Sequence, residues 1–129
     1  MIICDTNIFI EIFRQNFFIR SELEKIGYDN IAISDVVKAE LFFGAKDKID
    51  LQNIKKSIED FPVLSIQTEI SRMAVDFVAN YCLPQKLNLP DALIAATAIY
   101  YDIELFTLNT KDFKFIPNIK LYQHSIKTV

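Results

Sequence analysis

The 129-residue sequence contains little glycine, proline, cysteine or histidine. Glycine and proline together occupy only six positions and hydrophobic residues make up 51%, so the composition argues against disorder and predicts a well-buried core. The two cysteines, Cys4 and Cys82, are too few for a disulfide scaffold and indicate buried free thiols in a reducing cytosol. The single histidine, His124, cannot build a histidine-based zinc site.

Long apolar runs are also missing. No stretch of about 18 uncharged apolar residues occurs, which argues against a membrane span. The opening residues MIICDTN have no basic segment followed by an apolar run and do not resemble a secretory signal. We therefore expect a cytoplasmic protein of one domain, residues 1–129. The net charge of −3 is unusual for a nucleic-acid-binding protein, unless several of the acids hold divalent cations.

Strand-like and helix-like segments alternate along the chain. Short apolar runs predict strands at residues 1–4, 30–34, 62–66 and 104–107, with residues 120–122 as a candidate last strand. Helical periodicity or cap residues predict helices after Asp5 and at residues 16–26, 35–45, 47–61, 68–82 and 89–101. Such alternation implies right-handed crossovers and a parallel sheet. In these sheets, ligands bind beyond the carboxyl ends of the strands.

Two acidic residues are placed unusually for surface carboxylates. Asp5 ends the first strand; taken alone, it is explained as a cap of the following helix. Glu40 shares a predicted helix face with Val36, Val37 and Phe43, where an unpaired carboxylate would cost several kcal/mol. The alternative is that the helix turns slightly and Glu40 lies at the boundary of the core.

Three further polar residues follow the same pattern. Asp91 lies on a face with Ala95 and Ala98 in the most apolar helix, although a favourable contact with the helix dipole would also explain it. Asn109 and Asp112 follow the strand at residues 104–107 and could reach the same sheet edge, or they could form a simple turn and helix cap.

Taken together, these acids predict a metal centre. Carboxylates gathered at one end of a sheet repel each other, and they tolerate this proximity best when they share divalent cations. Oxygen ligands without cysteine or histidine favour Mg²⁺ or Mn²⁺ over Zn²⁺. Carboxylate-bound metal with open positions for phosphate and water suits phosphodiester hydrolysis.

Four short motifs carry a resemblance to a known family. They are ICDTN at residues 3–7, AEL at 39–41 with Gly44, PDALIAATA at 90–98 and TLNTKDF at 107–113. Each motif is weak alone, but their order and spacing resemble the PIN-domain family, and most closely its VapC-type toxins. The resemblance covers residues 1 to about 115. It implies a Rossmann-like three-layer α/β/α sandwich with a mainly parallel central sheet.

The resemblance also implies an activity and a site. A PIN domain of this kind is an Mg²⁺- or Mn²⁺-dependent endoribonuclease, and the matching metal ligands here are Asp5, Glu40 and Asp91. A fourth acid commonly stands where this chain has Asn109, so the chain departs from the family pattern. Asp112 is close enough in sequence to substitute, or it only caps a short helix. We therefore expect one strong metal site and a weaker second one.

The resemblance further implies an RNA substrate, a homodimer and a cognate antitoxin protein that blocks the toxin. Eleven phenylalanines include the adjacent pairs Phe17–Phe18 and Phe42–Phe43. Neighbouring helix residues point about 100° apart, so each pair predicts either a wide core face or an exposed apolar patch for a partner. Basic residues such as Arg14, Lys38 and Lys46 are candidates for guiding RNA, although solvated surface is the ordinary role for any one of them.

Two alternatives remain at this point. A phosphoryl-transfer domain needs a nucleophilic aspartate with a second acid close by, but no acid follows Asp5 until Glu11. The second alternative is a catalytically inactive PIN-like binding module. The main argument for it is that the chain has Asn109 where the family commonly has a fourth acid. The three retained acids argue against it.

Overall fold

The computed structural model of the protein describes residues 1–126. Four parallel strands form one sheet in the order β3-β2-β1-β4 within these residues. The strands are β1 (Ile2–Cys4), β2 (Ile31–Ser34), β3 (Val63–Leu64) and β4 (Glu104–Phe106). The first strand is central, with Ile2 paired to Ile31 on one side and to Glu104 on the other. Its residues are buried, as is typical of strands in a parallel sheet.

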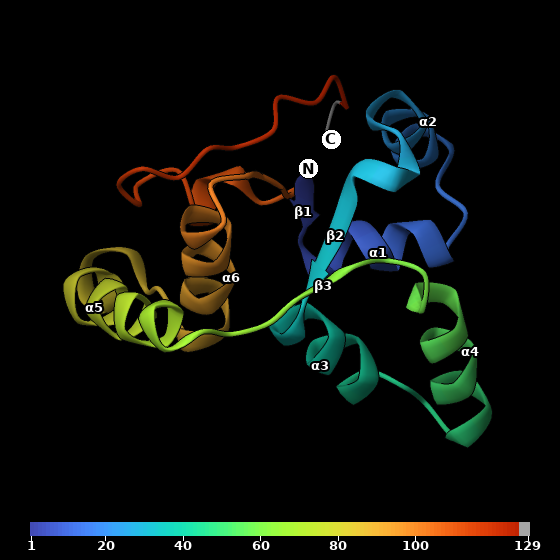
Figure 1. The fold of residues 1–129 in the computed structure, drawn as a ribbon, viewed down its shortest axis with the longest axis horizontal. Helices are drawn as coiled ribbons and strands as arrows, with labels where there is room; N and C mark the ends of the chain where they lie inside the picture. The colour runs from blue at the N-terminus through green and yellow to red at the C-terminus, as the bar shows by residue number, and fades with distance from the viewer. Residues whose placement is uncertain (127–129) are drawn as a thin grey trace.

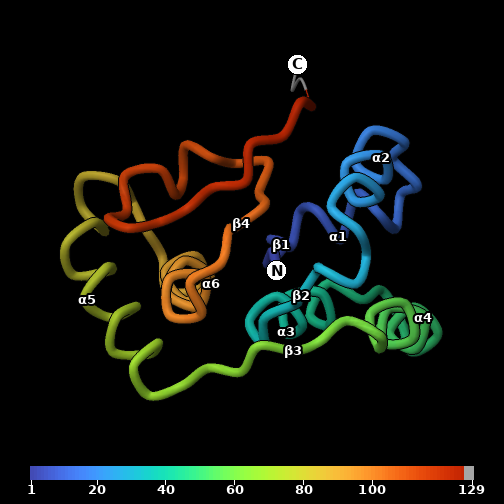
Figure 2. The backbone as a smooth tube through the Cα atoms, turned by 45° about the horizontal axis from the view of Figure 1, so that its top comes forward, coloured from blue at the N-terminus to red at the C-terminus, as the bar shows by residue number. Residues whose placement is uncertain are grey.

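Six α-helices surround the sheet in the described part of the chain. They are α1 (Thr6–Phe13), α2 (Phe17–Ile26), α3 (Asp35–Phe43), α4 (Lys48–Ile58), α5 (Thr68–Gln85) and α6 (Leu89–Tyr100). Helices α5 and α6 lie on one side of the strands, and α1, α2 and α4 lie on the other (Figures 1 and 2). The expected α/β/α sandwich with a parallel sheet is confirmed. No helix within residues 1–126 combines the length and the apolar character that crossing a membrane requires.

Side-chain caps determine where several helices begin. The Asn16 side chain accepts hydrogen bonds from the backbone N–H groups of Phe18 and Ile19 at the start of α2. Ser34 accepts one from Val37 at the start of α3. Each cap satisfies amide groups that have no partner inside the helix. At the other end of α2, Gly27 adopts a φ of 89°, a left-handed conformation that glycine tolerates well.

Helix α6 forms the centre of the core, as its apolar sequence predicts. Its buried positions include Ile94 and the alanines at 92, 95, 96 and 98. Small alanine side chains allow neighbouring elements to approach closely, and α6 packs extensively against α5. The position of Asp91 in the first turn of this helix places its carboxylate at the edge of the core.

Several predictions differ from the structure. The helix predicted at residues 47–61 ends at Ile58. The helix predicted to end at residue 82 continues to Gln85 and includes Pro84 in its last turn. The candidate strand at 120–122 is reduced to a single parallel bridge between Leu105 and Leu121. Glu40 does not share a buried stripe with Phe43, because Phe43 is 93% exposed. Glu40 is half-buried at the boundary of the core.

The phenylalanine pairs are mostly exposed. Phe17 is 72% and Phe18 is 66% exposed, and only Phe42 packs partly against the core. A wide core face therefore does not explain these pairs, because α2 and α3 each turn only one stripe toward the sheet. The other prediction for Phe17, Phe18 and Phe43, an exposed apolar surface, is confirmed.

Candidate metal-binding active site

Two neighbouring strands place polar residues at one edge of the sheet. Asp5 directly follows β1 and Thr107 directly follows β4, and these two strands pair in parallel with Cys4 beside Phe106. The backbone N–H of Asp5 donates to the carbonyl of Phe106 at 2.9 Å, which extends the ladder to the site. The register of β1 and β4 thus brings together residues that lie about a hundred positions apart.

Asp5 is held in a defined orientation. It is 6% exposed, and its Oδ1 accepts a hydrogen bond from the backbone N–H of Thr6 at 2.8 Å. Its Oδ2 accepts one from the Thr107 hydroxyl at 2.8 Å, while Asn7 lies 3.4 Å from the same oxygen. Asp5 is therefore both the cap of α1 and a candidate metal ligand, so the two interpretations of this residue are compatible.

Thr107 and Asn7 form a second set of contacts around Asp5. The buried Thr107 oxygen also accepts a hydrogen bond from the backbone N–H of Asn109 at 3.1 Å. The Asn7 side-chain oxygen accepts one from the backbone N–H of Leu108 at 3.3 Å. These bonds connect the loop after β4 to the start of α1. They fix the direction in which the Asp5 carboxylate faces.

Glu40 reaches the same area from α3. Its Oε1 accepts a hydrogen bond from the Thr6 hydroxyl at 2.7 Å. Thr6 therefore contacts Glu40 through its side chain and Asp5 through its backbone N–H. One residue at the start of α1 positions two of the three predicted metal ligands.

Asp91 comes from the first turn of α6. The Asn88 side chain caps this helix by accepting a hydrogen bond from the backbone N–H of Asp91 at 3.0 Å. The Asp91 carboxylate accepts no hydrogen bond from the described residues and is half-buried. Our sequence interpretation did not single out Asn88, although an asparagine directly before the Leu-Pro start of a helix is a recognisable cap signal.

Burial and neighbouring negative charges raise the pKa of two acids at this site. Burial, and then the negative charges of Asp5, Glu40 and Asp112, raise the pKa of Asp91 from 3.8 to about 6. Burial also raises the pKa of Asp5, and the charges of Glu40 and Asp112 add to this effect. Hydrogen bonds from Thr107 and Thr6 act in the opposite direction but do not cancel it. The negative charges of Glu40 and Asp112 thus act on both Asp5 and Asp91, and the four carboxylates of this acidic group repel each other.

The structure distinguishes the two candidates for the fourth polar position. Asp112, at the end of the short 3₁₀ helix η2 (Thr110–Asp112), is half-buried, and its charge acts on both Asp5 and Asp91. Asn109 is exposed, and its side chain makes no hydrogen bond to the described residues. Asp112 therefore belongs to the acidic group, while Asn109 contributes its backbone N–H to Thr107.

These residues suit a hydrated hard cation better than a fully protein-ligated one. Within residues 1–126, no three His, Cys, Asp or Glu side chains are placed to hold a metal ion directly. Mg²⁺ usually keeps several water molecules and uses one or two carboxylates. Four carboxylates that repel each other, two of which (Asp91 and Asp112) accept no hydrogen bond from the described residues, fit such a cation.

Comparisons with known proteins agree with this geometry. The PIN domain family matches residues 2–117. A protein of Rickettsia bellii named Ribonuclease VapC is 31% identical, with 98% of each chain covered.

Two solved structures are similar throughout. A toxin–antitoxin complex from Klebsiella pneumoniae aligns with a TM-score of 0.77 and 34% identity over 92% of this chain and 95% of the other. VapBC2 from Rickettsia felis, bound to a DNA fragment from its promoter, aligns with a TM-score of 0.79 and 30% identity over 95% of this chain and 98% of the other. The chain belongs to the PIN-domain family and is a relative of its VapC-type ribonucleases.

Proposed function

We propose that the protein is a metal-dependent endoribonuclease and the toxin of a toxin–antitoxin pair. The observation that carries this proposal is the group of four carboxylates at the carboxyl edge of the sheet, where burial and mutual repulsion raise the pKa of Asp5 and Asp91. A relative named as a ribonuclease supports the reaction class. The described fold extends over almost the whole chain, and we propose that residues 1–129 act as one domain.

Asp5, Glu40 and Asp91 are the proposed ligands of Mg²⁺ or Mn²⁺, with Asp112 as the fourth acid. A bound cation supplies positive charge for the phosphate and lowers the pKa of water. The protein's own part is orientation: Thr6 directs Glu40 and Thr107 directs Asp5. The carboxylate of Asp91, whose pKa is raised to about 6, accepts no hydrogen bond from the described residues, so both of its oxygens are available to a cation.

The structure also bears on the two alternatives, a phosphoryl-transfer domain and a catalytically inactive PIN-like binding module. An aspartyl-phosphate mechanism needs a nucleophilic carboxylate open to solvent, whereas Asp5 is 6% exposed and both of its oxygens accept hydrogen bonds. An inactive binding module is favoured by the exposed Asn109 alone. The negative charge of Asp112, which acts on both Asp5 and Asp91, supports Asp112 as the fourth acid and argues against this alternative.

The proposed partners are RNA, an antitoxin protein and a second copy of the chain. Similar structures named as toxin–antitoxin complexes support the antitoxin, and Phe17 and Phe18 provide exposed aromatic surface for a protein partner. For the homodimer, the support is an apolar hollow of about 780 Å³ between α3 and α6, which includes Phe43 and Leu89. Phe43→Ser is expected to shift a dimer toward monomer in sedimentation, and an unchanged mass would contradict this surface.

The decisive experiment is RNA cleavage by antitoxin-free protein. The full chain is incubated with total cellular RNA and Mg²⁺ or Mn²⁺, with a chelator control. Asp5→Asn and Glu40→Gln proteins run beside it, and Glu24→Gln serves as a matched control on the exposed face of α2. Discrete products that need both the metal and the two carboxylates support the proposal. A folded protein that binds Mn²⁺ but does not cleave RNA would favour the inactive binding module.

A further inference from the structure

The turn between α5 and α6 determines how Asp91 enters the acidic group. Lys86 ends α5 in a left-handed conformation with a φ of 57°. The backbone N–H groups of Lys86 and Leu87 both donate to the carbonyl of Tyr81 in the last part of α5. Leu87 is buried, and Asn88 is the cap residue of α6. Three residues therefore separate the two helices, and the core holds the middle one.

Pro90 decides which backbone N–H the Asn88 side chain can cap. A side chain at the cap position accepts from the second or the third residue of its helix. The second residue of α6 is Pro90, which has no backbone N–H, so Asp91 is the remaining choice. On α2, where the second residue is Phe18, the Asn16 side chain accepts from both positions. Proline thus directs the Asn88 oxygen to the backbone N–H of Asp91, 3.0 Å away.

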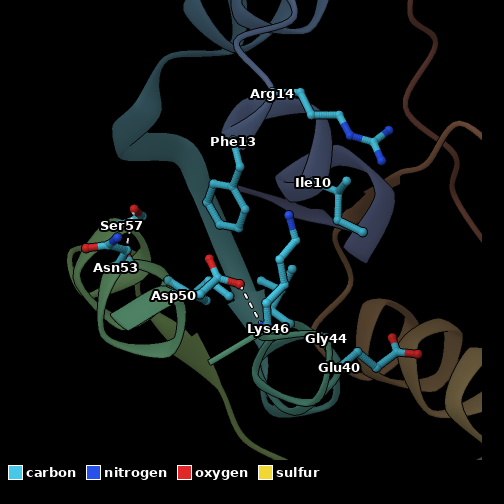
Figure 3. A pocket seen from close by; sticks show the side chains of 11 residues that line it. Ile10, Phe13, Arg14, Glu40, Gly44, Lys46, Asp50, Asn53 and Ser57 are labelled. Carbon is cyan, nitrogen blue, oxygen red and sulfur yellow. Dashed lines mark hydrogen bonds between the residues drawn. The ribbon is translucent and has the colours of Figure 1, made fainter. Parts of the chain in front are cut away.

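Helix α4 shows how an aspartate at the same position behaves when a donor is free. Asp47 caps α4 through the backbone N–H of Asp50, as Asn88 caps α6 through that of Asp91. The Asp50 carboxylate turns back and accepts from the backbone N–H of Lys46 at 2.9 Å, the hydrogen bond drawn dashed in Figure 3. This return bond resembles one half of a capping box and ties the carboxylate to the chain before the helix.

Asp91 makes no such return bond. The equivalent donor would be the backbone N–H of Leu87, but this group already donates to the carbonyl of Tyr81 at 3.3 Å. Pro90 has no N–H, and the N–H of Asp91 itself donates to Asn88. With these three positions unavailable, the Asp91 carboxylate accepts no hydrogen bond from the residues that the structure describes.

The three proposed metal ligands are thus oriented in two ways. The carboxylates of Asp5 and Glu40 accept hydrogen bonds from the Thr107 and Thr6 hydroxyls. Asp91 is held through its backbone alone, so both of its oxygens keep their lone pairs for a cation or for water bound to it. A backbone donor would occupy one of these lone pairs and neutralise part of the charge that attracts the cation.

We propose that Asn88 and Pro90 are positioning residues of the metal site, which keep the Asp91 carboxylate free of backbone donors and available to a divalent cation. Neither residue needs to touch the metal, because both act through the backbone of the first turn of α6. The inference rests on the proposed function and extends it to the segment Asn-Leu-Pro-Asp at residues 88–91. This segment then has two roles, since it starts the helix and prepares one ligand.

The test is the affinity of the full chain for Mn²⁺, measured by calorimetric titration. Pro90→Ala supplies a new N–H in the first turn, and Asn88→Ala frees the N–H of Asp91, so both return a donor to the carboxylate. Each variant is expected to raise the Kd for Mn²⁺ roughly tenfold, as for a change in the partners that orient a metal ligand. Asn88→Ser keeps a cap oxygen and is expected to restore the wild-type Kd.

Stability measurements separate this role from a merely structural one. Asn88→Ala removes a helix cap and is expected to lower the free energy of unfolding, and so is Asn16→Ala on α2. Asn16→Ala is the matched control, because it removes a cap of the same residue type from another helix and is expected to leave the Mn²⁺ affinity unchanged. Pro84→Ala, in the last turn of α5, is the control for removal of a helix proline. Urea titrations in chelator compare the stability of all these proteins.

RNA cleavage by the same proteins distinguishes this inference from the proposed function. Wild-type Kd values for Mn²⁺ in both Pro90→Ala and Asn88→Ala would overturn the positioning role, even if the wild-type protein cleaves RNA. Equal losses of affinity in Asn88→Ala and Asn16→Ala would overturn it as well, because general loosening of the fold would explain them. Weaker Mn²⁺ binding in the two α6 variants of a protein that cuts no RNA would support the positioning role and contradict the nuclease. A wild-type protein that binds no Mn²⁺ would overturn both.

Discussion

Two regions of the molecule bury carboxylates, but the pKa of the buried acid is raised in one region and lowered in the other. In the acidic group, burial and mutual repulsion raise the pKa of Asp91 to about 6. On α2, Glu22 is 3% exposed, yet its pKa is lowered to about 2. Burial alone would raise the pKa of Glu22, but the hydrogen bonds and the positive charge around it outweigh that effect.

The difference lies in the donors. Glu22 accepts hydrogen bonds from the Ser125 hydroxyl at 2.6 Å, the Ser125 backbone N–H at 2.8 Å and the Tyr122 hydroxyl at 2.9 Å, and Lys25 lies 3.8 Å away. Burial and the bond to Glu22 raise the pKa of Tyr122 to about 12, so this hydroxyl remains a donor. Glu22 is supplied with donors and stabilises the fold, whereas Asp91 accepts no hydrogen bond from the described residues and is suited to bind a cation.

The largest expected effect is on catalysis. Asp91→Asn is expected to lower the rate of RNA cleavage roughly 100-fold, as for removal of a group that stabilises charge in the transition state. Asp112→Asn is expected to cause a smaller loss, and Asn109→Ala little loss, since only Asp112 belongs to the acidic group. Single-turnover cleavage rates measure all three variants. Equal losses at Asn109 and Asp112 would contradict the assignment of the fourth acid.

The second prediction concerns the stability of the Glu22 region. Glu22→Ala leaves the Tyr122 and Ser125 donors without their acceptor and is expected to lower the free energy of unfolding by about 2–3 kcal/mol. Glu24→Ala, at an exposed position of the same helix, is the matched control and is expected to change it little. Urea titrations measure both variants. A stable Glu22→Ala protein would show that these hydrogen bonds contribute little to the fold.

The third prediction concerns metal binding. Mn²⁺ at a hundred times its Kd is expected to stabilise the wild-type protein by about 2.7 kcal/mol. Asp91→Asn is expected to lose most of this stabilisation, and Glu22→Gln to keep it. Calorimetric titration is expected to give one strong site per chain. Two equally tight sites in the free protein would contradict this.

The smallest effect is the dependence of stability on pH in chelator. The folded pKa of Asp91, about 6, lies above its ordinary 3.8, so this group contributes stability below about pH 4 that is lost as the pH rises through 6. Glu22 has a folded pKa of about 2 and an ordinary value of 4.5. It contributes stability above pH 4.5 that is lost as the pH falls toward 2.

Urea titrations across this pH range separate the two groups. Asp91→Asn is expected to flatten the profile between pH 4 and 6, by well under ~1.4 kcal/mol per pKa unit, because solvent screens a half-buried carboxylate. Glu22→Gln is expected to flatten it below pH 4.5. An identical profile in Asp91→Asn and wild-type protein would show that the acids do not repel each other in the folded state.

Most of the fold could be predicted from the sequence, because its elements have local signals. Local sequence patterns identify these elements: cap residues such as Asn16 and Ser34, the apolar runs of the strands and the periodicity of α5. The last strand could not be predicted reliably, because residues 120–122 make only one bridge and pairing depends on a partner elsewhere in the chain.

The acidic group was also predictable, from acids at strand ends and on apolar helices. Which residue completes the acidic group could not be predicted, because Asn109 and Asp112 lie only three positions apart. In the structure, the path of η2 leaves Asn109 in solvent, and the charge of Asp112 acts on Asp5. The role of Glu22 had no local signal either, since its partners lie at the other end of the described chain.

The sequence by itself determined the order of strands and helices, the acids that end at one sheet edge and the family to which the chain belongs. Apolar periodicity, cap residues and short motifs carry that information locally. Only the tertiary structure decided which carboxylates repel each other and which one is satisfied. The physical reason is that the pKa and the accessibility of a side chain depend on donors, charges and packing brought together from distant segments.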